Sequence, residues 1–375
     1  MKKVCFNWAV ADYFGWGVYG YNLLIYGRTH PTLEVSSLTA PSFLYPLSPI
    51  ASSLLHQYKP KPNARLELEE NDVFLNYLGV TNRPLEKAKF RDIGVIFSEA
   101  NPMADQEIRN LKEYEFIVAG SSWNAAVLEE AGIKTHTVIQ GIDTDLFRPS
   151  PKRYFKNRFV VFSGGKLEYR KGQDLVLKAF ARFAAKHPDA LLVTAWRSQW
   201  EESLAPSVNH SQVCEPLHAS PDMGNSIYDW ILRNGVMPNQ VLCLDTAPNR
   251  LMPDVFREVD LAVFPNRCEA GTNLIAMEAL AYGLPCLISQ NTGHLDIIKK
   301  NNGIPYNAIP LSLQRPIEGL GVNGWGESSL DEIVDSMEEA YQGRLGLDRD
   351  VVRGSMLNYS WERSIDQLLG LFVEG

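Results

Sequence analysis

The chain has 375 residues, of which 45% are hydrophobic and 21% are charged, and these values are typical of a globular protein. One hydrophobic core rarely serves a chain of this length, so we expect two domains. The formal net charge of −8 argues against non-specific binding to nucleic acid, and no nucleic-acid partner is expected.

Cysteine usage and hydropathy indicate a cytoplasmic protein. The five cysteines are scattered and form no CxxC pair, which is typical of reduced thiols. The N-terminal segment meets Asn7 and Asp12 within a short apolar run, which predicts a first strand rather than a signal peptide. No apolar run approaches the ~20 residues that span a bilayer. A peripheral contact with a membrane stays open.

The first half of the chain alternates strand and helix signals. A strand is expected over residues 4–10, then a glycine turn with Gly15 and Gly17, then a helix over 21–26. The turn is close to GxGxxG, a pattern that also fits a tight turn without a ligand. A strand entering a loop is expected over 93–101, and further strands over 116–119 and from 135 on. A helix is expected over 123–131, capped by Ser121 or Ser122 and ended by Gly132.

The second half repeats this rhythm, with strands at 159–162, 190–195, 241–244, 261–264 and 287–289 and helices at 174–186, 252–259, 274–281, 330–341 and 361–373. Residues 197–226 are polar and irregular and suggest an insertion or lid, although 226–233 has helical character, and 297–298 continues the strand pattern. Such alternation predicts parallel sheets covered on both faces, with ligands at the carboxyl ends of the strands. We place one domain at 1–150, a second at 151–345, and a C-terminal segment with its helix at 346–375.

The segment FPNRCEAGTNLIAMEALAYGLPCLIS, residues 264–289, combines a strand, a polar loop and a helix that is apolar on nearly every side. An all-round apolar helix is usually buried, and a buried carboxylate such as Glu278 must be paired or neutralised. Gly271, Thr272 and Asn273 open the helix, and a helix N-terminus is a natural anion site. The other interpretation, a core helix whose glutamate is satisfied by a neighbouring arginine, fits this local pattern equally well.

A basic glycine-rich loop, SGGKLEYRKGQD, follows the first strand of the second half. An isolated loop of this kind is most often a solvated basic surface. Beside a glycine turn, however, a lysine and an arginine suit a diphosphate, the lysine as a point charge and the arginine as a fork.

Five segments, in this order, resemble the retaining glycosyltransferases of family 4 (glycosyl transferases group 1), which have the GT-B fold. They are GIDTDLFRP (141–149), GKLEYRKGQDLVLKAF (165–180), EAGTNLIAMEALAYGLP (269–285), NTGHLDII (291–298) and YSWERSIDQLL (359–369). The resemblance covers most of residues 115–373 and is weaker in the first 110. It implies an α/β protein with two Rossmann-like parallel-sheet domains facing a cleft, and a C-terminal helix that crosses back to the first domain.

The resemblance also implies roles for individual residues. Glu278 would bind the ribose hydroxyls of a nucleotide, Glu269 would face the donor sugar, and Lys171 would neutralise the diphosphate, so that Lys171, Glu269 and Lys166 form the expected catalytic set. The full expected donor-binding set is Gly15, Gly17, Gly165, Lys166, Arg170, Lys171, Gly271, Thr272, Asn273, Leu274 and Glu278.

Three features depart from the family pattern. Glu269 and Glu278 are nine apart, so the spacing is E-x8-E rather than E-x7-E, and Lys166 stands where the family usually has arginine. The first-domain histidine of many members has no counterpart near 97–103, where Glu99 and Asn101 stand. His294 is a minor candidate for a donor contact, and a structural role is its more common alternative.

The implied activity is transfer of a sugar, with retention, from a UDP-, GDP- or ADP-sugar to a hydroxyl of an unknown glycan, lipid or small molecule. No cofactor and no metal are expected. Asp143 and Asp145 have DxD spacing, but they lie in the domain junction, where aspartate more often forms turns. Acceptor choice is expected in residues 38–62 and 99–106.

Two other classes of function are weighed against this activity. One is a non-catalytic nucleotide- or sugar-binding protein on the GT-B fold. The other is a Rossmann oxidoreductase, which is disfavoured because no clear strand leads to Glu34, the acidic residue near the required distance from the glycine turn.

Overall fold

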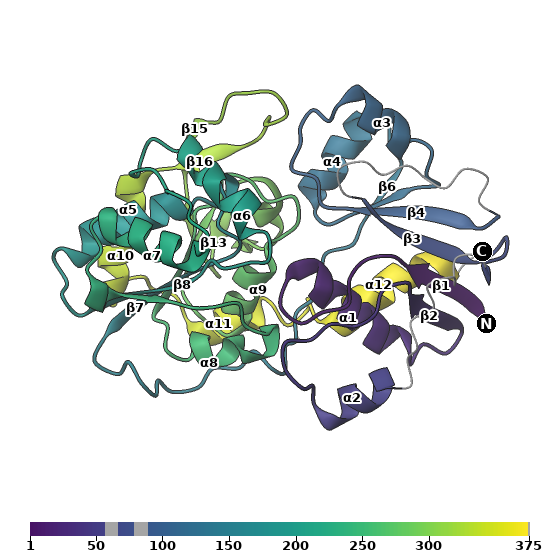
Figure 1. The fold of residues 1–375 in the computed structure, drawn as a ribbon, viewed down its shortest axis with the longest axis horizontal. Coiled ribbons are helices and arrows are strands. Elements are labelled where there is room, and N and C mark those ends of the chain that lie inside the picture. Colours follow the sequence, from purple (N-terminus) through teal and green to yellow (C-terminus); the bar gives the residue numbers. More distant parts are fainter. Residues whose placement is uncertain (57–66, 79–88, 374–375) are drawn as a thin grey trace.

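The computed structural model describes residues 1–56, 67–78 and 89–373, which form two parallel six-stranded sheets with helices around them (Figure 1). The first sheet has the order β2-β1-β3-β4-β5-β6, and every neighbouring pair in it is parallel. Its strands are β1 (Lys2–Phe6), β2 (Leu33–Ser37), β3 (Val73–Leu78), β4 (Arg91–Ile96), β5 (Ile117–Ala119) and β6 (Thr135–Thr137). Its helices are α1 (Gly15–Gly27), α2 (Pro49–His56), α3 (Asp105–Leu111) and α4 (Ser122–Glu130).

The second sheet has the order β14-β11-β10-β7-β8-β9 and is also parallel throughout. Its strands are β7 (Phe159–Gly164), β8 (Ala190–Ala195), β9 (Val241–Cys243), β10 (Leu261–Phe264), β11 (Cys286–Ser289) and β14 (Ile309–Leu311). Its helices are α5 (Gln173–Ala184), α6 (Glu201–Leu204), α7 (Met223–Arg233), α8 (Met252–Phe256), α9 (Leu274–Ala281), α10 (Leu330–Tyr341) and α11 (Arg349–Gly354). Two short antiparallel pairs complete this half, β12 (Lys300–Asn301) with β13 (Ile304–Pro305), and β15 (Leu313–Pro316) with β16 (Gly326–Ser328).

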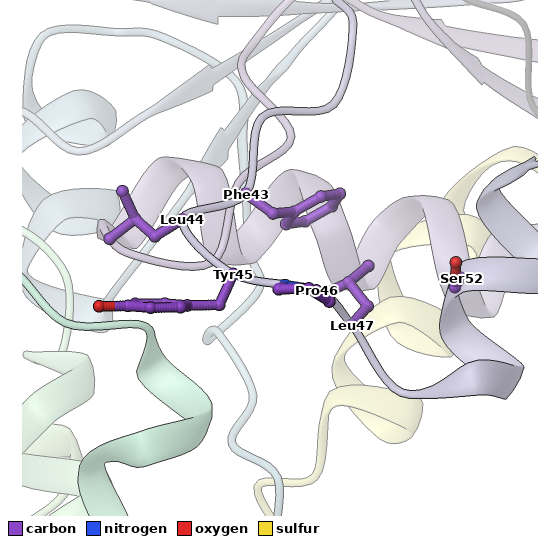
Figure 2. A pocket seen from close by; sticks show the side chains of 6 residues that line it. All are labelled: Phe43, Leu44, Tyr45, Pro46, Leu47 and Ser52. Carbon is purple, nitrogen blue, oxygen red and sulfur yellow. The ribbon is translucent and has the colours of Figure 1, made fainter.

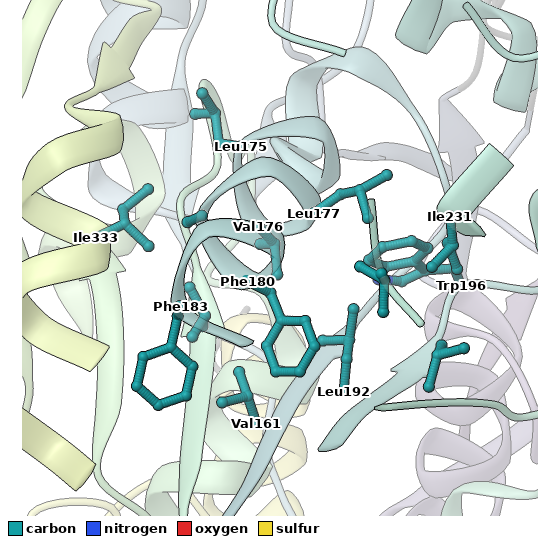
Figure 3. Packing of buried hydrophobic residues seen from close by; sticks show 14 of the residues in the cluster. Val161, Leu175, Val176, Leu177, Phe180, Phe183, Leu192, Trp196, Ile231 and Ile333 are labelled. Atoms are coloured by element: carbon teal, nitrogen blue, oxygen red, sulfur yellow. The ribbon is translucent and has the colours of Figure 1, made fainter. Parts of the chain in front are cut away.

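Each sheet has its own hydrophobic core. In the second half, α5 buries Phe180 and Phe183 against β7 and β8, beside Trp196 and Ile333 of α10 (Figure 3). The apolar residues of α5 recur with helical spacing and are buried, and two polar residues of its first turn, Gln173 and Asp174, are buried as well. The central strands of both sheets, such as β3, β8 and β10, are buried along most of their length, as parallel strands covered on two faces must be.

The last helix, α12 (Trp361–Val373), returns to the first sheet and lies beside α1 (Figure 1). The Trp361 ring stacks on Tyr19 with 5.8 Å between centroids, and Lys2 Nζ donates to the carbonyl of Phe372 at 2.8 Å. Ser360 accepts from the backbone N–H of Arg363 at 3.3 Å, as expected for the N-cap. The predicted fold class, with its returning C-terminal helix, is confirmed. The domain limits at 150 and 345 stay predictions.

The glycines after the first strand differ from the expected turn. The strand ends at Phe6 rather than Val10, and α1 already begins at Gly15. The loop between them packs tightly on the helix, because a Cβ at Gly20 would lie 2.2 Å from the carbonyl oxygen of Ala9, and a Cβ at Gly17 would lie 2.6 Å from Ala11. These glycines therefore permit a close helix–loop contact.

Other differences are smaller. Residues 297–298 form no strand, because they follow a short 3₁₀ helix, Thr292–Asp296. The segment 197–226 holds α6, a 3₁₀ helix at Ala205–His210 and the first turn of α7. The strand entering a loop that was expected over 93–101 is confirmed, since β4 ends at Ile96 and 97–101 form a loop. Strands β2, β3 and β14, helices α2, α3 and α11, and the antiparallel pairs were not predicted.

Candidate active site

Loops that follow strands of the two sheets meet each other. Arg170, after β7, pairs with Glu99, after β4, at 3.2 Å. Ser121, after β5, donates to the carbonyl of Ala270, after β10, at 2.5 Å. Carboxyl ends of parallel strands are where such folds bind ligands, and here they bring both halves of the chain to one place.

The basic loop between β7 and α5 is held in shape by two glycines. Gly165 has a φ of +107° and Gly172 a φ of +71°, values in the region that favours glycine. A Cβ at Gly172 would lie 2.3 Å from the carbonyl of Pro265, so the loop also approaches the next segment of the site closely. Between the glycines, Tyr169–Lys171 forms a 3₁₀ turn.

The structure brings together Lys171, Arg170 and Glu269, three residues of the predicted site. Lys171 Nζ and Asn266 Nδ2 both donate to Glu269 Oε1, and Arg170 Nη1 donates to Oε2 at 3.2 Å. Burial opposes ionisation of Glu269, but the charges of Lys171 and Arg170 outweigh it and lower the pKa of this carboxyl to about 2. Glu269 is therefore an anion that holds two cations in place.

Arg170 forms ion pairs with three carboxylates. It pairs with Glu168 at 2.8 Å as well as with Glu99 and Glu269. Although burial acts against its charge, these three carboxylates raise the pKa of its guanidinium. Lys166 is held more loosely, with its side chain 36% exposed and 3.7 Å from Glu168.

Helix α9 begins at the same place. Its N-cap, Asn273, has a φ of +64°, rare for a residue other than glycine. Asn273 Nδ2 lies 3.2 Å from Nε2 of the buried His294, whose Nδ1 lies 3.0 Å from Ser289 Oγ. Burial lowers the pKa of His294 to about 4, so this imidazole is neutral and can accept from Asn273. His294 thus supports the start of α9.

Residues Gly271, Thr272 and Leu274 complete the helix start. A Cβ at Gly271 would lie 3.0 Å from the Phe97 ring, and the Thr272 hydroxyl donates to Met277 Sδ at 2.9 Å. Gly15 of the first domain faces Leu274, whose Cδ1 would lie 3.8 Å from a Cβ at Gly15. Gly17 packs on its own loop instead, and its predicted donor contact stays a prediction.

Glu278 lies deeper in α9. It is 4% exposed and accepts a hydrogen bond from Asn249 Nδ2 at 2.5 Å. Burial raises the pKa of this carboxyl to about 8, and the charge of Asp143 adds to the effect. The backbone N–H of Asn249 donates to the carbonyl of Asp12 at 2.5 Å, so the first domain also reaches this end of the site.

A buried arginine that the sequence did not single out ties the loops together. Arg267 is 0% exposed and forks onto Asp174 at 2.8 and 2.6 Å. Its Nε donates to Glu327 at 2.8 Å, and its guanidinium lies 4.0 Å from the Tyr169 ring centroid. In the sequence it is one charged residue in the polar loop between the strand and the apolar helix of residues 264–289, and that charge was the only signal for it.

Asn249, Asn266 and Asp12 were also missed. The contacts of Asn249 and Asp12 connect segments far apart in the sequence, whereas Asn266 contacts Glu269 three residues away. Short polar residues in loops carry no pattern of their own.

Asp143 acts as a turn former, since its Oδ1 accepts from the backbone N–H groups of Asp145 and Leu146. Within residues 1–56, 67–78 and 89–373, no group of three or more His, Cys, Asp or Glu side chains is placed to hold a metal ion. The same part of the chain contains no helix with the length and apolarity needed to cross a membrane.

The segment expected to choose the acceptor forms a pocket at the surface of the first domain (Figure 2). Its volume is about 450 Å³, and it is lined by Phe43, Leu44, Tyr45, Pro46, Leu47 and Ser52. The backbone N–H of Leu44 donates to Asp12 Oδ1 at 3.3 Å, which links this wall to the Glu278 end of the site. Residues 57–62 of the predicted acceptor segment lie outside the described residues.

Solved structures share this architecture over the whole chain. Sucrose-phosphate synthase of Thermosynechococcus elongatus superposes with a TM-score of 0.66, covering 99% of this chain and 98% of that one at 12% identity. HepE of Anabaena, solved with UDP and glucose, gives 0.65, covering 99% of each chain at 14% identity. The protein has the GT-B fold.

Sequence comparisons point to one family for the second half. Residues 157–310 match the family model described as glycosyl transferases group 1. A D-inositol 3-phosphate glycosyltransferase of Acidothermus cellulolyticus is 24% identical over 259 residues, which are 64% of this chain and 48% of that protein. A relative of the same name from Catenulispora acidiphila is also 24% identical, over 53% of its length. The chain thus spans about half the length of these relatives.

Proposed function

We propose that this protein is a retaining glycosyltransferase, which moves a sugar from a nucleotide diphosphate sugar to an acceptor hydroxyl. The observation that carries the proposal is the ion-paired cluster of Lys171, Arg170 and Glu269, whose glutamate lies in the loop that leads into the N-terminus of α9. Cations and a helix N-terminus stabilise the negative charge that develops on a departing diphosphate. The match to glycosyl transferases group 1 over the residues that carry this cluster supports the same activity.

The donor is proposed to lie along α9. Backbone N–H groups at Asn273 and Leu274 would face the phosphates, and Glu278 would bind the ribose hydroxyls. Since Asn249 already donates to Glu278, the amide and the carboxyl would share those hydroxyls. Lys171 is paired with Glu269 before the donor arrives, whereas Lys166 is more exposed and can turn toward a phosphate.

The chemistry follows from this placement. The bond between the anomeric carbon and the diphosphate oxygen breaks, and the acceptor oxygen bonds to the same face of that carbon. The acceptor proton passes to the departing phosphate, in keeping with the resemblance to retaining family 4 enzymes. Lys171, Arg170 and Lys166 would stabilise the leaving group, and no metal or cofactor enters the proposal.

We propose a UDP-sugar as the first donor to test, because HepE was solved with UDP-glucose. Thermal-shift titration with UDP-, GDP- and ADP-glucose should show a rise in Tm for one nucleotide, since a ligand of the folded state stabilises it. NMR of the product formed in the presence of EDTA should then show the anomeric configuration of the donor. Inverted product, or a requirement for metal, would contradict the corresponding part of the proposal.

Replacing Lys171 tests the catalytic role. Lys171→Ala should lower the turnover of the donor by roughly 10²- to 10³-fold, the effect of losing one group that stabilises transition-state charge. Lys186→Ala is the matched control and should leave turnover unchanged. Lys186 is 66% exposed, follows the end of α5 and pairs with Glu338 of α10. Near-normal transfer by Lys171→Ala would refute the assignment. Tight nucleotide binding without any sugar release by the natural protein would indicate a binding protein instead.

The proposed location is cytoplasmic. All five cysteines are free thiols, which suits a reducing compartment.

A further inference from the structure

Four side chains of the first domain gather where its strands end beside the proposed donor site. Trp16 lies in the first turn of α1, Tyr77 near the end of β3, and Phe97 and Glu99 just after β4. Tyr77 and Phe97 both pack edge-on against the Trp16 ring, with centroid distances of 4.5 and 4.8 Å. None of the three rings has a role in the donor chemistry proposed above.

Tyr77 of this aromatic group is held in place by hydrogen bonds of β3 and is accessible to a ligand. Asn7 Oδ1 accepts from the backbone N–H of Tyr77 at 2.7 Å, and Asn7 Nδ2 donates to Asn76 at 2.7 Å, so the end of β3 is pinned. Tyr77 is nevertheless 38% exposed. A fixed ring with an accessible face and a hydroxyl tip offers both apolar contact and hydrogen bonding.

The group also borders the site of transfer. Phe97 touches Gly271, where a Cβ would come within 3.0 Å of the ring, and Glu99 pairs with Arg170 at 3.2 Å. Glu99 follows Phe97 by two residues in the loop after β4. One edge of the group therefore meets the start of α9, and Tyr77 at another edge is 38% exposed.

The charge that the first domain contributes at this place disfavours an anionic acceptor. The three cations proposed to stabilise the donor diphosphate, Lys166, Arg170 and Lys171, belong to the second half of the chain and pair with Glu99, Glu168 and Glu269. Glu99 is the carboxylate that belongs to the first domain, and its side chain is 33% exposed. A carboxylate accepts hydrogen bonds from hydroxyl groups and repels a phosphate.

We propose that Trp16, Tyr77 and Glu99 form the acceptor subsite, and that it takes a neutral, polyhydroxylated ring rather than a phosphorylated one. The inference rests on the proposed glycosyl transfer and adds the class of acceptor. The apolar face of the ring packs on Tyr77 and Trp16, and Glu99 accepts from a hydroxyl next to the one that reacts. Aromatic walls with a few convergent polar groups are typical of small-molecule sites.

The test uses the donor found by nucleotide screening and two acceptor pools, one of neutral mono- and disaccharides and one of sugar and inositol phosphates. Transfer should be faster to the neutral pool. With the best acceptor, Tyr77→Ala should raise the acceptor KM about three- to tenfold, as expected for an aromatic contact of ~0.5–1.5 kcal/mol, and Glu99→Gln should raise it too. The Tm shift caused by the nucleotide should not change in Tyr77→Ala.

Tyr154→Ala is the matched control, because Tyr154 is 70% exposed and lies outside the residues assigned to the donor and acceptor sites. It should leave the acceptor KM unchanged. The inference is overturned by faster transfer to the phosphate pool, by no transfer to either pool while the donor is hydrolysed, or by a KM effect of Tyr154→Ala without one of Tyr77→Ala. Failure of the proposed function has a different signature, since the natural protein would then neither bind nor consume any nucleotide sugar.

Discussion

Loss of the Arg267 guanidinium is expected to destabilise the second domain strongly. The side chain is fully buried, and it neutralises two carboxylates, Asp174 and Glu327, with five hydrogen bonds or ion-pair contacts between 2.6 and 2.8 Å that include the carbonyl of Tyr169. Removing one partner of a buried charge pair leaves an uncompensated charge, which costs about 3–5 kcal/mol. Arg267→Ala should therefore lower the free energy of unfolding by about that amount.

An exposed arginine that pairs with the same Glu327 carboxylate supplies the control. Arg315 pairs with Glu327 at 2.8 Å, but its side chain is 62% exposed. Surface pairs of this kind contribute about 0–1 kcal/mol, so Arg315→Ala should have little effect. Arg267→Lys keeps the charge but cannot fork onto Asp174, and an intermediate loss is expected.

Thermal unfolding measures the difference. A domain of the size predicted for residues 151–345 shifts its Tm by about 2–4 °C per kcal/mol, so Arg267→Ala should lower Tm by at least about 6 °C. Hydrogen exchange should speed up in the Tyr169–Lys171 turn, whose carbonyl the arginine binds. A Tm within about 2 °C of the natural protein, or equal losses for Arg267→Ala and Arg315→Ala, would refute the reasoning.

Two further substitutions test the buried carboxyl of α9 and the packing of α1. The ordinary pKa of a glutamate, 4.5, rises to about 8 for the buried Glu278, so the contribution of its protonated form to stability is complete below 4.5 and is lost as the pH rises toward and above 8. Glu278→Gln should thus gain stability relative to the natural protein as the pH is raised from about 5 to about 9, and a difference in Tm that is independent of pH would contradict this. Gly20→Ala would place a Cβ 2.2 Å from the carbonyl of Ala9 and should cost about 1–3 kcal/mol. Gly370→Ala in α12, where a Cβ meets nothing within 4 Å, should be neutral or stabilising in the same thermal assay.

Some features could be predicted because they are local. The alternation of strands and helices, the capping residues Ser121 and Ser360, and the buried all-apolar α9 follow from periodicity and short spacings. The resemblance to family 4 assigned Lys171 and Glu269 to one site, and the structure brings them together because each follows a strand of the same sheet and parallel strands end at one edge.

The start of α1 was set by packing rather than propensity. Gly15, Gly17 and Gly20 lower helix propensity, so the sequence favours a turn there. In the folded protein the same glycines let the helix approach the loop of Ala9 and Ala11, and the burial gained by that approach outweighs the local preference.

The sequence by itself determined the architecture and the main charged groups of the candidate site, because short local sequence patterns indicate both. Only the tertiary structure decided which groups neutralise one another. Arg267 meets Asp174 from 93 residues away and Glu327 from 60, and Arg170 of the second domain meets Glu99 of the first. A buried charge must find a partner wherever the fold brings one close, and no short-range pattern specifies which distant residue that will be.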